Sequence, residues 1–206
     1  MKIRTVAASL MLCLLMLAGA ARVWAGGASD SVRNILDKAM EIQTRPDLEG
    51  EEHKADRARL VRQIISDNFL TSEMAMDAVR DSWGKASPKQ RTEFSDLFKS
   101  LFQESYTRMV LNFLKKETIE YPGEEPERNG MQVKTVIMRA NEHIPVDYYV
   151  VQKGARWMIE DVVIDGVSIV DNYKGSFSHV VQAESFEGLL KRMRLQSRTE
   201  QEEVGR

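Results

Sequence analysis

The sequence predicts an α+β fold in which a small curved antiparallel sheet is wrapped by helices. Three observations lead to this fold class. Apolar residues recur at helical spacing over residues 28–116. Over residues 117–164 they alternate with polar residues, as in strands that have one covered face. Helical spacing returns over residues 167–196, so helices and strands are segregated along the chain, as expected for α+β.

Residues 1–25 have the pattern of a secretory signal peptide. Lys2 and Arg4 form a basic start, and an apolar run follows from Val6 to Ala18. That run is about 13 residues long, too short to span about 30 Å of hydrocarbon as a helix. Small residues precede the expected cleavage point after Ala25. The sequence therefore predicts a cleaved signal and export from the cytoplasm.

The only cysteine, Cys13, lies inside the signal segment, so the exported chain has none. An exported protein without disulfides depends on its core for stability, which is typical of the bacterial periplasm. We expect a single domain over residues 26–196, followed by a polar tail over residues 197–206. Thiol catalysis and cysteine-ligated metals are excluded for this domain.

The charge balance argues against nucleic acid as a partner. The signal segment contains Lys2, Arg4 and Arg22 and no acidic residue. Removing these three from the 29 basic residues leaves 26 against 31 acidic ones, a net charge of −5. Nucleic-acid-binding domains are basic, and constitutive adhesion to anionic lipid also requires a basic surface.

The helices are delimited by local signals. Ser29 or Asp30 can cap a first helix, which ends at a polar connection over residues 45–53. Further helices are expected over residues 54–67 and 72–83. The clearest start is the segment SPKQ at 87–90, a capping box with proline in the first turn. The helix behind it should reach about Lys115 and carries a wide aromatic stripe.

Strands are predicted over residues 131–140, 144–152 and 156–164, with a short candidate at 117–121. The intervening segment 122–130 is rich in turn residues and ends in Asn-Gly, which suits a reversal. Strict alternation places three sets of side chains on the covered face: Met131, Val133, Thr135 and Ile137; Ile144, Val146, Tyr148 and Val150; Trp157, Ile159, Asp161 and Val163.

Few residues have the spacing of a catalytic or metal site. His53, His143 and His179 lie in three different elements without paired spacing, which favours scattered surface histidines over a zinc site. There is no nucleophile elbow and no glycine-rich phosphate loop. Ser168 follows Asp-Gly-Val and is best interpreted as the cap of the next helix.

Asp161 carries the strongest enzyme hypothesis. Burial on the covered strand face would raise its pKa, and Tyr148 and Tyr173 supply hydroxyls, so the sequence allows an isomerase or dehydratase of cone-like fold. No second ionisable group is clearly placed beside Asp161, however. An aspartate bonded to backbone or to an arginine is the favoured interpretation.

The apolar content leaves two further alternatives open. A curved sheet wrapped by helices encloses a cone that is filled either by its own side chains or by a ligand. The first alternative gives an interaction module with an ordinary core. The second gives a carrier, and the eight methionines that remain after the signal would suit variable apolar ligands. Periodicity does not distinguish a filled cone from a hollow one.

Two segments resemble a known family. Residues 157–177 are similar to the W-x-x-x-D-v-x-x-x-G-v-S-x-x-x-x-y-x-x-x-F signature of the MlaC-type periplasmic lipid carriers, also called toluene-tolerance or organic-solvent-resistance auxiliary proteins. Residues 83–106 resemble the family's segment around the capping box. Gly175 and Ser178 depart from the family pattern, which expects larger residues there.

The resemblance implies a nuclear-transport-factor-2-like sheet and a pocket for phospholipid acyl chains, with phospholipid as cargo and no cofactor, metal or catalysis. It also implies transfer between an outer-membrane lipoprotein–porin complex and an inner-membrane ABC transporter with an MCE-domain subunit, and a role in outer-membrane asymmetry. A hopanoid or another lipid is the alternative cargo. The side chains expected to contact lipid are Phe98, Phe102, Tyr106, Met109, Val133, Val146, Tyr148, Trp157, Ile159, Val163, Tyr173 and Phe177.

Overall fold

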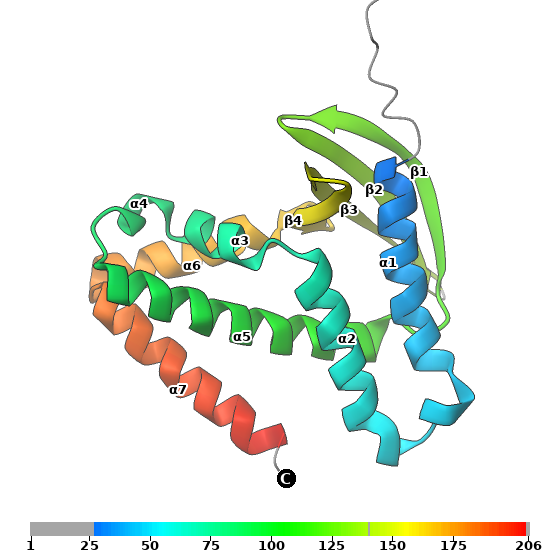
Figure 1. Ribbon diagram of the computed structural model, residues 1–206, viewed down its shortest axis with the longest axis horizontal. Coiled ribbons are helices and arrows are strands. Elements are labelled where there is room, and N and C mark those ends of the chain that lie inside the picture. The colour runs from blue at the N-terminus through cyan, green and yellow to red at the C-terminus, as the bar shows by residue number, and fades with distance from the viewer. Residues whose placement is uncertain (1–26, 140, 205–206) are drawn as a thin grey trace, which may run out of the picture.

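A computed structural model describes residues 27–139 and 141–204, and the expected signal peptide lies outside these residues. A five-stranded antiparallel meander forms a curved sheet in the order β1-β2-β3-β4-β5, and helices cover it (Figure 1). The predicted α+β fold class is confirmed. The strands are β1 (Thr118–Glu127), β2 (Gly130–Arg139), β3 (Glu142–Lys153), β4 (Arg156–Ile164) and β5 (Val167–Ser168).

Helices surround the sheet and form a second group beyond it (Figure 1). The first helix packs on β1, β2 and β4, whereas the long fifth helix contacts the second, third and seventh. The helices are α1 (Gly27–Thr44), α2 (Lys54–Asn68), α3 (Thr71–Ala78), α4 (Arg80–Trp83), α5 (Pro88–Phe113), α6 (Ile169–Ala183) and α7 (Phe186–Val204).

The start of α5 follows the sequence prediction. Ser87 accepts a hydrogen bond from the backbone N–H of Gln90, and the Gln90 side chain accepts one from the backbone N–H of Ser87. Pro88 occupies the first turn, where no intrahelical donor is needed. The predicted capping box is confirmed, and it fixes where the 26-residue helix begins.

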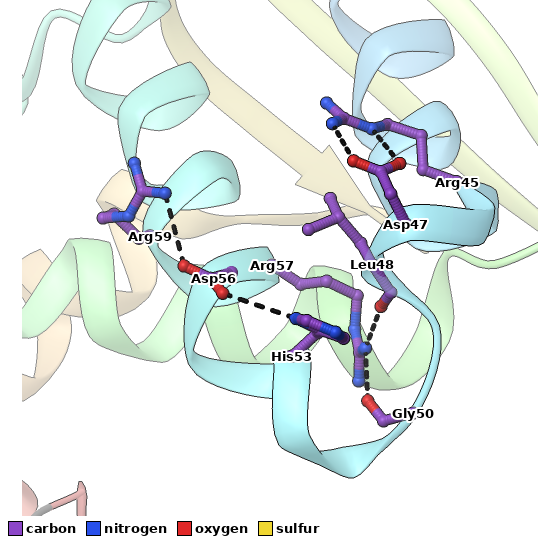
Figure 2. Close-up of polar contacts among 8 residues, drawn as sticks. All are labelled: Arg45, Asp47, Leu48, Gly50, His53, Asp56, Arg57 and Arg59. Carbon is purple, nitrogen blue, oxygen red and sulfur yellow. Dashed lines mark hydrogen bonds and ion pairs between the residues drawn. The ribbon is translucent and has the colours of Figure 1, made fainter.

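The polar connection after α1 is an ordered turn containing two short 3₁₀ helices, Pro46–Leu48 and Glu51–His53. Figure 2 shows how Arg57 closes it: one guanidinium nitrogen donates to the carbonyl oxygens of Leu48 at 2.5 Å and Gly50 at 2.7 Å. Arg57 lies on α2, so this contact ties the turn to the helix that follows. The relative position of α1 and α2 is thereby fixed.

The first strand extends through the segment expected to be a turn. β1 pairs with β2 from Thr118 to Glu127, with a register irregularity between Glu120 and Gly123. It is an edge strand, and an edge is where proline is tolerated in a sheet. The reversal lies at residues 128–129, one position earlier than Asn129-Gly130, and Arg128 takes the left-handed conformation with φ of 44°.

The alternation predicted for β4 is wrong beyond Ile159. Tyr149 of β3 pairs with Asp161 and Val150 pairs with Ile159, so Glu160 is an extra residue in a β-bulge. One inserted residue exchanges the two faces of a strand. Ile159 and Val162 are therefore buried together, whereas Asp161 and Val163 are only partly buried.

Two helix boundaries also differ from the sequence prediction. The helix expected over residues 72–83 is divided at Val79, whose backbone is not helical, into α3 and α4. The last helix does not end near residue 196 but continues to Val204. The segment expected to be a polar tail is therefore helical over most of its length.

Candidate functional site: an apolar cavity between sheet and helices

A cavity of about 300 Å³ lies between the inner face of the sheet and the helices α1, α2 and α5. Its wall combines residues from segments that are distant in the sequence, and side chains from three strands contribute to it. The lining residues are Ile35, Leu36, Ala39, Val61, Ile64, Ile65, Phe69, Tyr106, Met109, Val110, Phe113, Leu114, Ile137, Arg139, Ile144, Val146, Tyr148, Ile159, Val162, Ile164 and Ile169.

The cavity wall is almost wholly hydrocarbon. Aliphatic side chains predominate, Arg139 is the one charged residue among those lining the cavity, and Tyr106 and Tyr148 contribute the phenol groups. Such a wall offers dispersion contacts without directional hydrogen bonds, which suits a flexible apolar ligand. It does not provide the convergent acids and bases that catalysis requires.

The cavity has a closed end and an open end along the sheet. In register, Val133 lies opposite Tyr148, Thr135 opposite Val146, and Ile137 opposite Ile144. The first two pairs are buried and the third is partly exposed. The next pair on this face, Arg139 and Glu142, is exposed, so the mouth lies beside the last residue of β2 and the first residue of β3.

Helix α1 is bound to the end of α5 beside this mouth. The side-chain amide of Gln43 donates to the backbone carbonyl oxygens of Val110 at 2.9 Å, Leu111 at 3.1 Å and Leu114 at 2.9 Å. Carbonyls at the end of a helix lose intrahelical donors, and Gln43 supplies a donor there, adding to the bond that Val110 accepts from the backbone N–H of Leu114. The two helices that form opposite parts of the cavity wall are held together at this point.

The two tyrosines of the wall are harder to ionise than a phenol in water. Burial raises the pKa of Tyr148 well above its ordinary value. Burial is also the main reason that the pKa of Tyr106 is raised, and the nearby Tyr173 and Asp161 add to the effect. Neutral phenols preserve the apolar character of the wall, since an ionised side chain there would lose its hydration.

Five of the twelve residues expected to contact lipid line this cavity: Tyr106, Met109, Val146, Tyr148 and Ile159. The bulge displaces Val163 to the other face of β4 and brings Val162 and Ile164 to the wall instead. Trp157 lies at the far end of the same strand and packs closely against Gly27.

The remaining aromatic candidates lie in the hydrophobic core next to the cavity rather than on its wall. Phe98 and Phe102 on α5 stack at 5.8 Å between ring centroids, and Phe98 meets Tyr173 of α6 edge-on at 5.1 Å. Phe177 packs against the same group, and Val133 is fully buried in the sheet. The four aromatic rings pack together where α5 meets α6, so side chains fill that part of the molecule.

The wall residues on α1 and α2 were not predicted as part of a site. These residues belong to the apolar stripes from which the two helices were predicted, and they include Ile35, Leu36, Ile64 and Ile65. A stripe shows which face of a helix is covered but not what covers it. Their assignment to the cavity required the three-dimensional arrangement.

Asp161 is engaged by the chain itself. One carboxylate oxygen accepts hydrogen bonds from the backbone N–H groups of Val162 and Val170, and the other accepts from the Ser168 hydroxyl at 2.5 Å. Ser168 in turn accepts from the N–H of Asp171 and caps α6, as predicted. Burial raises the pKa of Asp161, and these donors oppose the shift.

The position of Asp161 bears on the enzyme hypothesis. The residue is absent from the cavity wall, and its carboxylate holds the start of α6 against β4. A general acid or base needs access to a substrate proton. The hydrogen-bond arrangement therefore supports the structural interpretation of Asp161 rather than an isomerase or dehydratase.

The described residues contain neither a metal-binding cluster nor a membrane-spanning helix. Among residues 27–139 and 141–204, no three acidic, histidine or cysteine side chains are grouped so that they would hold a metal ion. Within the same part of the chain, no helix combines the length and apolar character needed to cross a membrane.

The fold and the cavity define a small α+β protein with an apolar chamber between its sheet and its helices. A family model described as MlaC protein matches residues 33–195. The chain therefore belongs to the MlaC protein family, which confirms the resemblance noted in residues 83–106 and 157–177.

One solved structure shows the same fold. It is a phospholipid-binding protein from Ralstonia solanacearum in complex with a phospholipid. It matches this chain with a TM-score of 0.71 and 23% sequence identity, covering 84% of this chain and 98% of that one. A comparison with curated proteins gave no match.

Proposed function

We propose that this protein is a periplasmic carrier that binds the acyl chains of a phospholipid in its apolar cavity. The observation that carries the proposal is the cavity itself, whose wall consists mainly of apolar side chains from four helices and three strands. Membership of the MlaC family and the likeness to a phospholipid-binding protein support the choice of cargo.

The physical need for such a carrier follows from the cost of exposing lipid chains to water. Each methylene transferred from apolar surroundings to water costs about 0.8 kcal/mol. A single lipid crossing the aqueous periplasm unprotected would therefore meet a large barrier. A chamber that takes up the chains and leaves the headgroup at its mouth removes most of that barrier.

The pathway we propose is the one that the family resemblance implies. The carrier shuttles phospholipid between an outer-membrane lipoprotein–porin complex and an inner-membrane ABC transporter with an MCE-domain subunit. This traffic would maintain the lipid asymmetry of the outer membrane and so contribute to solvent tolerance. Export would depend on cleavage of residues 1–25. The net charge of −5 after that cleavage would favour release from anionic membranes.

A vesicle transfer assay tests the carrier function. Donor vesicles contain phosphatidylglycerol with a self-quenching fluorescent acyl chain, and acceptor vesicles contain none. Purified protein should increase the rate of dequenching in proportion to its concentration. A rate equal to that of vesicles alone, with protein that is folded by circular dichroism, would contradict the proposal.

A further inference from the structure

The inner face of the sheet ends at the cavity mouth in Arg139 and, opposite it, Glu142, and of these two residues only Arg139 lines the cavity. Ile137 and Arg139 are two residues apart on β2, so their side chains lie on the same face, and both line the cavity. Arg139 is exposed, and its guanidinium lies over the ring of Phe113 at 5.2 Å from the centroid. Phe113 ends α5 and is 55% exposed, so this pair stands where the wall meets solvent.

Arg139 has no acidic partner within the described part of the chain. Glu142 is directly opposite across the hairpin, yet no ion pair joins the two residues. Other arginines elsewhere in the described chain are paired, for example Arg62 with Glu104 and Arg194 with both Glu93 and Glu187. A guanidinium fork beside an apolar chamber, steadied by an aromatic ring, is available for an anion from outside the chain.

We infer that Arg139 binds the anionic group of the cargo and makes the carrier selective for acyl lipids that bear an oxyanion. The inference rests on the proposed function and specifies its substrate class. When acyl chains occupy the chamber, the first polar group of the lipid lies at the mouth. A phosphodiester or a carboxylate there presents two oxygens, which match the paired N–H donors of arginine.

The consequence is discrimination against uncharged lipids. A diacylglycerol or an uncharged hopanoid fills the chamber with the same hydrocarbon contacts but offers the guanidinium no anionic oxygen. Apolar walls discriminate weakly between chains, so the contact at the mouth determines the preference. The Phe113 ring is the positioning element, because it holds the guanidinium plane over the wall.

The test compares binding of dipalmitoyl phosphatidylglycerol, dipalmitoyl glycerol and palmitate to delipidated protein and to Arg139→Gln. Phosphatidylglycerol should bind about tenfold more weakly to the variant, whereas diacylglycerol should change less than about twofold. Arg139→Lys should have an intermediate affinity for phosphatidylglycerol, because lysine keeps the positive charge but lacks the paired N–H donors of arginine. The control Arg128→Gln removes the same charge at the opposite end of β2 and should behave as wild type.

Each outcome separates the inference from the proposed function. Equal affinity of the wild type for phosphatidylglycerol and diacylglycerol, or an equal loss for both in Arg139→Gln, would overturn the inference but not the carrier. Failure of the wild type to bind any of the three lipids would contradict the proposed function instead. A greater loss for phosphatidylglycerol than for palmitate would identify the phosphodiester as the group bound, and the reverse would identify the carboxylate.

Discussion

Filling the cavity should weaken lipid binding at least tenfold without unfolding the protein. Ala39 is the smallest side chain of the wall and lies on α1, facing the chamber. Ala39→Phe adds about six carbon atoms, which would displace a similar length of acyl chain. At about 0.8 kcal/mol for each methylene returned to water, the upper limit of the loss is about 5 kcal/mol.

The chain can take a different path within the chamber, so the expected loss is smaller than this limit. We expect at least a tenfold decrease in affinity, equivalent to about 1.4 kcal/mol. The assay is titration of delipidated protein with phosphatidylglycerol that carries a pyrene-labelled chain. The control Ala55→Phe places the same group on the exposed surface of α2 and should leave affinity unchanged.

Circular dichroism and a thermal melt establish that Ala39→Phe is folded. The added ring occupies space that is empty without ligand, so the melting temperature of the delipidated variant should equal or exceed that of the wild type. Wild-type affinity in a folded Ala39→Phe would refute the reasoning, because the chains would then lie elsewhere.

Three further predictions concern the stability of the protein and involve residues outside the cavity wall. Phe98→Ala should lower the free energy of unfolding by about 3–5 kcal/mol in urea titrations, because the Phe98 ring is only 1% exposed. The fraction of this variant that is folded should still bind lipid. Gly130→Ala should cost more than about 2 kcal/mol, since its Cβ would lie 2.0 Å from the carbonyl oxygen of Val150. Gly84→Ala, in open space, should change stability by less than about 0.5 kcal/mol. The third prediction concerns pH. Burial raises the pKa of Asp161 in the native state, so above pH 3.8 the native state binds more protons than the unfolded state. The contribution of Asp161 to the free energy of unfolding therefore falls as pH rises. Urea titrations should therefore show Asp161→Asn gaining stability relative to wild type between pH 4 and pH 7, and a constant difference would contradict the assignment.

The sequence predicted the features that depend on neighbouring residues. The capping box at Ser87 and the cap at Ser168 each involve bonds within three residues, so their signals are local. The faces of β2 and β3 also followed from simple alternation. The fold class was predictable because helical and strand periodicity occur in separate parts of the chain. This separation does not depend on the exact boundaries of each helix or strand.

The sequence did not predict the features that depend on distant partners. The bulge at Glu160 arises from the register of β4 against β3, which alternation within one strand does not reveal. The strand through Pro122 and Pro126 exists because β1 is an edge that pairs on one side only. The aromatic stripe of α5 was placed in the pocket, but α6 fills that end and the chamber lies toward Tyr106 and Met109.

The presence of a chamber was the least predictable feature. An apolar stripe of Ile35, Leu36 and Ala39 has the same spacing whether it packs on side chains or on empty space. The difference depends on how far the curved sheet stands from α1, α2 and α5. Only the assembled structure fixes that separation.

The most direct test of the carrier function is native mass spectrometry of the protein purified without detergent. The spectrum should show a discrete added mass that dissociates on activation, and solvent extraction should identify it as phospholipid. Ala39→Phe, purified in parallel, should carry much less of it. A wild-type protein that is folded and runs at the mass of the bare chain would contradict the claim that the cavity holds lipid.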